Sequence, residues 1–507
     1  MAFSTLRNVL VLLFAVAFSS IAAQAADAPL FVQGGLEDAT VSSDVYNTGG
    51  TLSVGGFTMQ VPKNVLVQFP AAWVPFKTFA TKKAEFIGYE TLVIGNFINS
   101  VPIVAQIIVY QFFEGLASGF IESVDYADGS LKIVNGPKIR ISDPNAVFSK
   151  GYGAHPEFTA DDESPSISSF SGFPMCIPRN TTDPLCPLSN RPFSGPGTFS
   201  APDPLVMAPL QAGDFITWQG IRKGGELIAF SIVAQNVQIT TLGDIVYVRM
   251  ELARLGIDNP NPNAEIAETR FIGFVSNTVA TVSLYAMDVD PCTGKTTDRI
   301  IASMGLKGGR NAQNRFEYRN DLLRRYTREY RVTAEIGGIE KTRVTKNGLI
   351  AGTYIQPVNV WIPGEQDVPG VPPVSHDFSQ MAFLNKGVGA DDDGNIWGPL
   401  DPFPQTGLFI ETPNCPVVVR PTPTSSAVPS ATSTEAAAPA ATSDAAAAAP
   451  VSVRRRGVQS YYTRERADGI ASAENKGTTE GPVRVAAGEE ALLAEARAEK
   501  AAARIAT

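Results

Sequence analysis

The sequence predicts an all-β protein in which two small β units stand in tandem before a β-sandwich-like region. The main observation is a hairpin pattern that occurs twice, over residues 51–61 and again over 130–141. In both runs apolar and polar residues alternate on either side of a turn that contains glycine, which is typical of antiparallel strands with one buried face. Each hairpin is followed by a second pair of strand runs, over 92–109 and over 215–235. The repeat predicts an architecture and assigns no chemistry to it.

The N-terminus has the three parts of a secretory signal, so residues 1–25 are expected to be a signal peptide. Arg7 precedes an apolar run from Val9 to Ala17, and Ala23-Gln24-Ala25 is a cleavage site of small residues. The apolar run is shorter than the ~20 residues that a membrane-spanning helix needs, and no later segment approaches that length. We therefore expect a secreted protein without a membrane span.

The body of the chain divides into three parts. The first β unit is expected over 26–115 and the second over 116–239. Within the second unit, residues 145–213 are rich in Pro, Ser and Gly, and we expect them to form a long surface insertion. Residues 240–413 contain strand-length apolar runs at the spacing of a sandwich, with a helical turn or two at 311–325.

The C-terminal part has a different composition. Residues 414–452 are rich in Pro, Thr, Ser and Ala and are expected to form an extended stalk, because they cannot bury enough apolar area to fold. Residues 453–507 begin with a basic run at Arg454–Arg456 and end in strong helix formers along a narrow apolar stripe. We expect them to be a disordered tail with nascent helix.

Four cysteines are few for a chain of this length, so we expect hydrophobic burial, and not a disulfide framework, to stabilise the core. Two disulfides are nevertheless expected in an exported protein. Cys176 and Cys186 bracket a Pro-rich loop, and closure over so few residues favours pairing them with each other. That choice leaves Cys292 and Cys415 as the second pair, although four cysteines allow three connectivities. Inside the first loop, Asn180-Thr181-Thr182 is an N-glycosylation sequon, so we expect a glycan at Asn180.

Charge and motifs argue against several classes of function. The formal charge of −9 favours solubility and does not indicate a nucleic-acid partner. The only histidines are His155 and His376, both in Pro-rich contexts, so a histidine-based triad or zinc site is not expected. No nucleophile elbow, phosphate-binding loop or dinucleotide fingerprint is present. Carboxylates remain candidates for catalysis, because glycosidase-type chemistry needs only two acids from distant strands; they are Asp288, Asp290 and Asp391.

The acidic run at 391–393 also suggests a metal site. Asp391, Asp393 and Asn395 stand at alternate positions, the spacing with which oxygen-rich loops coordinate calcium. The glycine and the distal glutamate of an EF-hand are missing from their places, and we favour a solvated acidic turn. We therefore expect no cofactor, and calcium is the one metal that the sequence suggests.

Aromatic and arginine residues mark a candidate ligand-binding surface. In the basic stretch 310–331, Tyr326, Arg328 and Tyr330 would share one face of a strand, which would suit sugars with acid groups or phosphate. The alternative, which we favour, is a solvated face whose charges are balanced by neighbouring acids. Trp397 is either an exposed platform for sugar stacking or a core anchor, and we favour the anchor because most tryptophans are largely buried.

Two resemblances extend this interpretation. The chain carries NGPKIRISDPNAVF at 135–148, SSFSGFPMCIPR at 168–179, DPLCP at 183–187 and APDPLVMAP at 201–209. With these segments it resembles a family of secreted proteins of filamentous fungi that has no assigned activity. The doubled hairpin unit is similar in pattern to the small OB-like β modules of some exported bacterial proteins, which implies that the two tandem units are OB-like β barrels. Neither resemblance brings catalytic positions with it.

These observations favour a non-enzymatic secreted or cell-wall-associated protein that recognises an extracellular polysaccharide or another extracellular protein. The alternative is an extracellular hydrolase, or a tailoring factor for a secreted metabolite, that uses the carboxylates named above. A third interpretation is a structural coat protein, of which strong self-association would be the sign.

Overall fold

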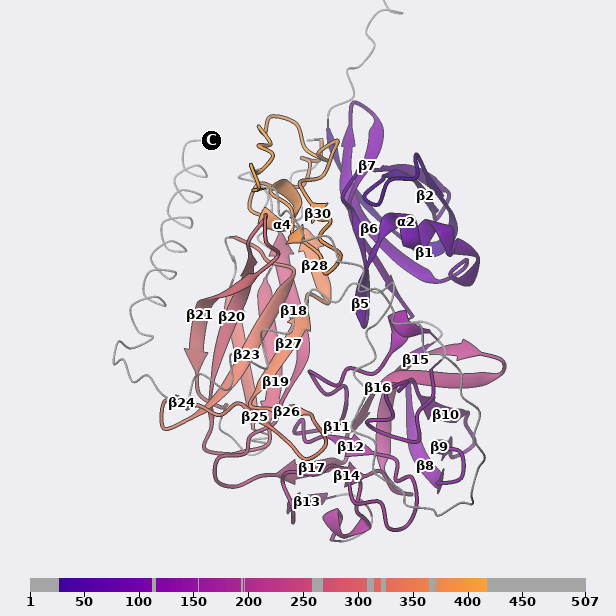
Figure 1. Cartoon of the computed structure of the whole chain (residues 1–507), viewed down its shortest axis with the longest axis vertical. Helices are drawn as coiled ribbons and strands as arrows, with labels where there is room; N and C mark the ends of the chain where they lie inside the picture. Colours follow the sequence, from indigo (N-terminus) through magenta and orange to yellow (C-terminus); the bar gives the residue numbers. More distant parts are fainter. Residues whose placement is uncertain are drawn as a thin grey trace, which may run out of the picture.

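The computed structural model of the chain describes residues 27–111, 115–153, 155–192, 195, 197–257, 268–307, 314–320, 325–363, 370 and 372–416. These residues form β-strands with two short α-helices, so the all-β prediction is confirmed. Figure 1 shows two small barrels, one above the other, and a sandwich of two sheets beside them. The predicted signal peptide (1–25), nearly all of the predicted stalk (414–452) and the predicted tail (453–507) lie outside the described residues.

The first barrel closes through five strands. Their order is β3-β2-β1-β6-β7, and β7 returns to pair with β3 in parallel at Gln60 and Ile103. The hairpin between β2 and β3 turns at Gly55 and Gly56, whose φ angles of 58° and 79° lie in the left-handed region that favours glycine. The five strands are β1 (Ala28–Val41), β2 (Gly50–Val54), β3 (Phe57–Val61), β6 (Glu90–Ile98) and β7 (Val101–Tyr110).

The second barrel repeats this topology. Its order is β10-β9-β8-β15-β16, and β16 pairs with β10 in parallel. A five-stranded barrel with the same order in both copies, closed by parallel pairing of the third and fifth strands, agrees with the predicted pair of OB-like units. The five strands are β8 (Ala117–Asp125), β9 (Ser130–Ile133), β10 (Lys138–Ile141), β15 (Phe215–Lys223) and β16 (Glu226–Ala234).

The barrels differ in the connection between their third and fourth strands. In the first barrel this connection is short and carries β4 (Leu66–Phe69), β5 (Ala72–Pro75), α2 (Phe76–Thr81) and the 3-10 turn η1 (Lys83–Glu85). In the second barrel it is the long insertion, residues 142–214. The insertion contains η2 (Pro156–Phe158), β11 (Ile167–Ser169), β12 (Met175–Cys176), η3 (Leu188–Asn190), β13 (Gly197–Ser200) and β14 (Ala208–Pro209), and β13 pairs with β17 (Val237–Thr240).

The insertion is fixed by buried polar pairs and by a disulfide. Arg191 donates from Nη1 and Nη2 to the two carboxylate oxygens of Asp214 at 3.0 and 2.9 Å, and both side chains are fully buried. A buried bidentate pair admits one geometry and so holds the segment that follows η3 against Asp214, the residue before β15. The predicted Cys176–Cys186 disulfide is confirmed.

The third region is a sandwich of two sheets. One sheet has the order β22-β19-β18-β28, and the other has the order β21-β20-β23-β24, with β27 also paired to β23. Phe271, Leu284 and Val332 are buried in the core that includes both sheets. The strands of the two sheets are β18 (Val248–Ile257), β19 (Thr269–Val275), β20 (Thr281–Val289), β21 (Thr296–Met304), β22 (Arg315–Asn320), β23 (Glu329–Ile336), β24 (Ile339–Glu340), β27 (Thr353–Pro357) and β28 (Val360–Pro363). A separate two-stranded sheet is formed by β25 (Arg343–Val344) and β26 (Ile350–Ala351).

The helical turn predicted at 311–325 is wrong over residues 315–320. These residues form β22, which pairs antiparallel with β19. Gly273 of β19 leaves the space in which the Phe316 ring packs, since a Cβ at Gly273 would lie 2.2 Å from the ring. The burial of Phe316 between the sheets therefore favours a strand, and not a helix, for residues 315–320.

The segment 372–416 runs from the sandwich to the side of the first barrel, and Figure 1 shows it in orange between the top of the sandwich and β7. It contains α4 (Ala382–Asn385), β29 (Gly389–Ala390) and β30 (Ile396–Trp397). Asn96 of β6 donates to the carbonyls of His376 and Pro404 at 3.0 and 2.8 Å and accepts from the His376 amide at 2.7 Å. Burial lowers the pKa of His376 to about 4, so this side chain is neutral at its place in the interface.

The end of this segment is tied to the sandwich by the second disulfide. Cys415 bonds to Cys292, which lies in the turn between β20 and β21, and the predicted pairing is confirmed. The disulfide closes a loop that includes most of the sandwich and the segment that covers the first barrel.

Phe158 of η2 joins the two barrels. Its fully buried ring lies 5.5 Å from the ring of Phe69 and 5.7 Å from that of Tyr89, both in the first barrel. On the other side it lies 5.8 Å from the ring of Phe230 on β16 of the second barrel. The contacts with Phe69 and Tyr89 are edge-to-face, a geometry that fixes the orientation of the rings as well as burying area.

We predict that the two disulfides contribute unequally to stability. The chain-entropy estimate is about 5 kcal/mol for the pair separated by 123 residues and about 3 kcal/mol for the pair separated by 10. C292S/C415S should therefore lower the thermal midpoint more than C176S/C186S, as measured by calorimetry on the purified variants. An equal or larger loss in C176S/C186S would contradict the role given to the 292–415 bond.

Candidate functional site

A cleft of about 640 Å³ lies between the second barrel and the sandwich. It is bordered by β15 and β16 of the barrel, by β18, β19 and β27 of the sandwich, and by the part of the insertion that precedes β12. Its volume is within the ~300–1,000 Å³ usual for small-ligand sites, and junctions between domains are frequent places for such sites. We take it as the candidate functional site.

The barrel wall of the cleft is polar because the strands alternate. Ile216, Ile232 and Ala234 point into the barrel and are fully buried, which turns the intervening side chains outward. Thr217 pairs with Val233 and Gln219 with Ser231 across the two strands. The outward side chains that line the cleft are Thr217, Gln219, Ser231, Val233 and Gln235.

The sandwich wall combines apolar and charged side chains. Ile272 and Phe274 of β19 line the cleft, whereas Phe271 of the same strand is fully buried in the core. Arg249 and Glu251 of β18 lie beside them, and Arg315 of β22 lines the same wall.

Arg249 is the most constrained charged group of the cleft. Its guanidinium carbon lies 4.7 Å from the centroid of the Phe274 ring and 5.4 Å from that of Phe170. Nε donates to the Phe170 carbonyl at 3.2 Å, and Nη2 donates to the Glu251 carboxylate at 3.1 Å. Burial is the main influence on the pKa of Arg249 and lowers it, because the side chain is only 7 % exposed.

The insertion supplies the turn that holds Arg249. Gly172 has a φ of 88°, and a Cβ there would lie 2.9 Å from the Cβ and the backbone nitrogen of Arg249. Glycine at this position therefore lets the turn approach β18 closely enough for Phe170 to cover the guanidinium.

The remaining border of the cleft carries an acid and a tyrosine. Asp161 accepts from the amides of Glu163 and Ser164, both at 2.9 Å, and the Ser164 hydroxyl accepts from the Ile355 amide of β27 at 2.9 Å. Tyr354 lies nearby, and burial followed by the negative charge of Asp161 raises the pKa of its hydroxyl. The cleft thus offers hydrogen-bond donors, acceptors and aromatic surface together.

The three acids predicted as alternative catalytic groups lie elsewhere and have structural contacts. Asp288 accepts from Arg299 Nε at 2.9 Å and lies 3.4 Å from Arg325 Nη2. Asp290 accepts from the amides of Cys292 and Thr293, and the Thr293 contacts lower the pKa of its carboxyl. Neither residue lines the cleft, nor does Asp391.

Asp391 organises the turn between β29 and β30. Its carboxylate accepts from the Asn395 amide at 2.8 Å, from Asn395 Nδ2 at 3.0 Å and from Trp397 Nε1 at 2.9 Å. Asp393 is exposed on the same turn. Across the described residues, no group of three or more His, Cys, Asp or Glu side chains is placed to share a metal ion. Calcium at Asp391, Asp393 and Asn395 stays a prediction.

Trp397 is a core anchor, so the exposed sugar platform is wrong. The side chain is 1 % exposed, and its ring makes an edge contact with Tyr46 at 5.4 Å. The Tyr46 hydroxyl donates to the Ile396 carbonyl at 2.7 Å, which joins the same turn to the first barrel.

The exposed or solvated face expected for Tyr326, Arg328 and Tyr330 is also wrong, because all three are buried. Tyr326 donates its hydroxyl to the Gly256 carbonyl at 2.7 Å, and the Tyr330 ring lies 4.8 Å from that of Phe271. The Arg328 guanidinium lies 4.4 Å from the centroid of Trp73, in the interface with the first barrel. The partners that bury these side chains come from distant segments, which the local pattern does not reveal.

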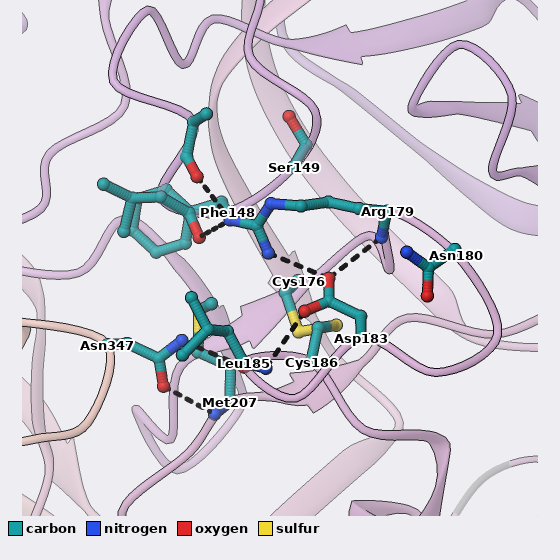
Figure 2. A network of polar contacts seen from close by, with 12 residues as sticks. Phe148, Ser149, Cys176, Arg179, Asn180, Asp183, Leu185, Cys186, Met207 and Asn347 are labelled. Atoms are coloured by element: carbon teal, nitrogen blue, oxygen red, sulfur yellow. Dashed lines mark hydrogen bonds and ion pairs between the residues drawn. A yellow bond between two sulfur atoms is a disulfide. The ribbon is translucent and has the colours of Figure 1, made fainter. Parts of the chain in front are cut away.

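Asn180 lies on an exposed part of the loop closed by Cys176 and Cys186. Its Oδ1 accepts from the amide and hydroxyl of Thr182, at 2.8 and 3.0 Å. The loop around it is ordered: Figure 2 shows Arg179 bonded to Asp183, with Asn180 at the edge of this network.

The residues of the cleft were not singled out by the sequence. Arg249 and Glu251 stand two apart in an apolar strand run, which places two charges on one strand face and is the only local signal. The other cleft residues lie in strands or in the insertion, and no local pattern distinguishes them before the fold brings them together.

No protein-family model matches the chain, and no curated protein matches its sequence. The resemblance to secreted fungal proteins therefore stays a prediction. Across the described residues, no helix has both the length and the apolar character needed to cross a membrane.

We predict that Asp391 stabilises the fold and that Asp393 does not. D391A removes the acceptor of three donors, one of them the buried indole N–H, and should lower the free energy of unfolding by about 2 kcal/mol. D393A is the matched control from the same turn and should change it by less than about 0.5 kcal/mol. Both are measured by denaturant unfolding, with calcium and with chelator.

A calcium-dependent stability that D393A abolishes would contradict this account of the turn. It would instead support the predicted calcium site at Asp391, Asp393 and Asn395.

Proposed function

We propose that the protein is a secreted, non-enzymatic binding protein that takes an extracellular polysaccharide chain into the cleft between the second barrel and the sandwich. The cleft is the observation that carries the proposal. Export is supported by the signal-like N-terminus and by the two disulfides, which persist in oxidising compartments.

The lining of the cleft suits a carbohydrate. Sugars offer many hydroxyl groups and weakly apolar ring faces, and they are bound by side-chain amides, carboxylates and guanidinium groups beside apolar rings. Polar groups for the sugar hydroxyls come from the side chains of Gln219, Gln235, Asp161 and Glu251. An apolar ring for the sugar ring face comes from Phe274. The polar barrel wall would be an unusual lining for a purely apolar ligand.

An extracellular hydrolase is the second candidate, because two acids line the cleft. Asp161 and Glu251 approach it from the insertion and from β18. Two carboxyl groups on either side of a glycosidic bond are the minimum for hydrolysis. Release of soluble sugar therefore separates the two proposals.

We expect the purified protein to be retained on an insoluble cell-wall polysaccharide without releasing soluble sugar. T217W places a large side chain on the outward face of β15 and should reduce retention about tenfold or more by filling the cleft. The matched control is T58W, an equally bulky change on an exposed position of β3 in the first barrel, and it should leave retention unchanged. Depletion from the supernatant and reducing-sugar release are measured together.

Retention that T217W does not affect would place binding outside the cleft. Sugar release that depends on Asp161 or Glu251 would favour the hydrolase, and no retention on any polysaccharide would reject the proposal.

We also propose that Asn180 carries an N-linked glycan. Because the residue is exposed on an ordered loop, N180Q should remove the mass of one glycan from the secreted protein and leave its stability nearly unchanged. Intact-mass spectrometry with and without glycosidase checks this, and equal masses before and after glycosidase would contradict it.

A further inference from the structure

We propose that Arg249 selects a ligand with a carboxylate group, so that the polysaccharide bound in the cleft contains acidic sugars. The inference rests on the proposed function, since it names the class of ligand for the same cleft. It is carried by the way the guanidinium group is held.

The guanidinium of Arg249 is fixed before any ligand arrives. Phe274 and Phe170 lie 4.7 and 5.4 Å from its central carbon, and the Phe170 carbonyl accepts from Nε. The turn that carries Phe170 reaches this position because Gly172 has no side chain. A fixed guanidinium loses little conformational entropy when it binds an oxyanion.

The charge of Arg249 is only partly compensated. Among the residues that the structure describes, its one carboxylate partner is Glu251, which it contacts through Nη2 alone and whose side chain is 48 % exposed. The third nitrogen, Nη1, donates to no group among the described residues. A largely buried cation with an unused donor favours an oxyanion, which accepts a charge-assisted hydrogen bond from that donor.

The other charges of the cleft limit the ligand further. Arg315 adds a second cation on the same wall, with Glu317 as its partner at 3.2 Å. Asp161 and Glu251 would repel a densely charged polyanion. The combination favours isolated carboxylates among neutral hydroxyl groups, as in a polysaccharide in which uronic acids alternate with neutral sugars.

The test uses an immobilised panel of oligosaccharides that contain uronic acids, each paired with its methyl-esterified or carboxyl-reduced form. The full-length secreted protein should bind at least one acidic member about tenfold more tightly than its neutral form, and added salt should reduce that preference. R249M keeps most of the side-chain volume between the two rings and should remove the preference. R249K keeps the positive charge but not the planar guanidinium group, and it should reduce the preference for the acidic member.

Two further variants separate recognition from folding. R140M is the matched control, because Arg140 also lies over an aromatic ring, that of Tyr152 at 4.8 Å, but does not line the cleft; it should keep the preference. E251Q removes the competing carboxylate at a half-exposed position and should tighten binding of the acidic member about threefold.

Binding of acidic and neutral members with equal affinity would overturn the role of Arg249 and leave the proposed function standing. A preference that survives R249M in a variant of unchanged thermal midpoint would overturn it too. If no oligosaccharide or polysaccharide is bound at all, the proposed function fails together with the inference.

Discussion

The burial of Phe158 between the two barrels is the contact on which the arrangement of the molecule depends. Its ring packs against Phe69 and Tyr89 on one side and against Phe230 on the other, so it contacts both barrels and stabilises their arrangement. The first barrel in turn shares a continuous apolar core with the sandwich. Phe230 also lines the cleft, so this chain of aromatic contacts extends to the cleft wall.

The long insertion of the second barrel supplies one border of the cleft. The corresponding connection in the first barrel is taken up by β4, β5 and α2, which pack against that barrel itself. In the second barrel the connection also adds a strand to the sheet, because β11 pairs in parallel with β16. This longer connection in addition closes one border of the cleft with Asp161, covers Arg249 with Phe170 and contains the buried Arg191–Asp214 pair. The candidate site is thus bordered by the connection in which the two barrels differ, and such loops are where function is most often placed on a common scaffold.

The parts that were predictable from the sequence are those with local signals. Alternating strands around Gly55 and Gly56 predicted the hairpins, and the short spacing of Cys176 and Cys186 predicted both disulfides, since the remaining pair followed from it. The failures share one cause, which is that burial is decided by partners far away in sequence. Phe316 forms a strand because Gly273 leaves room for it, and Arg328 is buried because Trp73 of the first barrel covers it. The cleft was missed for the same reason, since its walls come from the second barrel, the insertion and the sandwich.

The most direct measurement of the central claim is a crystal structure of the protein with a bound oligosaccharide. The account predicts electron density for the sugar between the outer face of β15 and β16 and the wall of β18 and β19, with an oxygen of the ligand at Arg249. Density for the sugar on another surface, such as the outer face of the β2–β3 hairpin, with the cleft filled only by water, would contradict it.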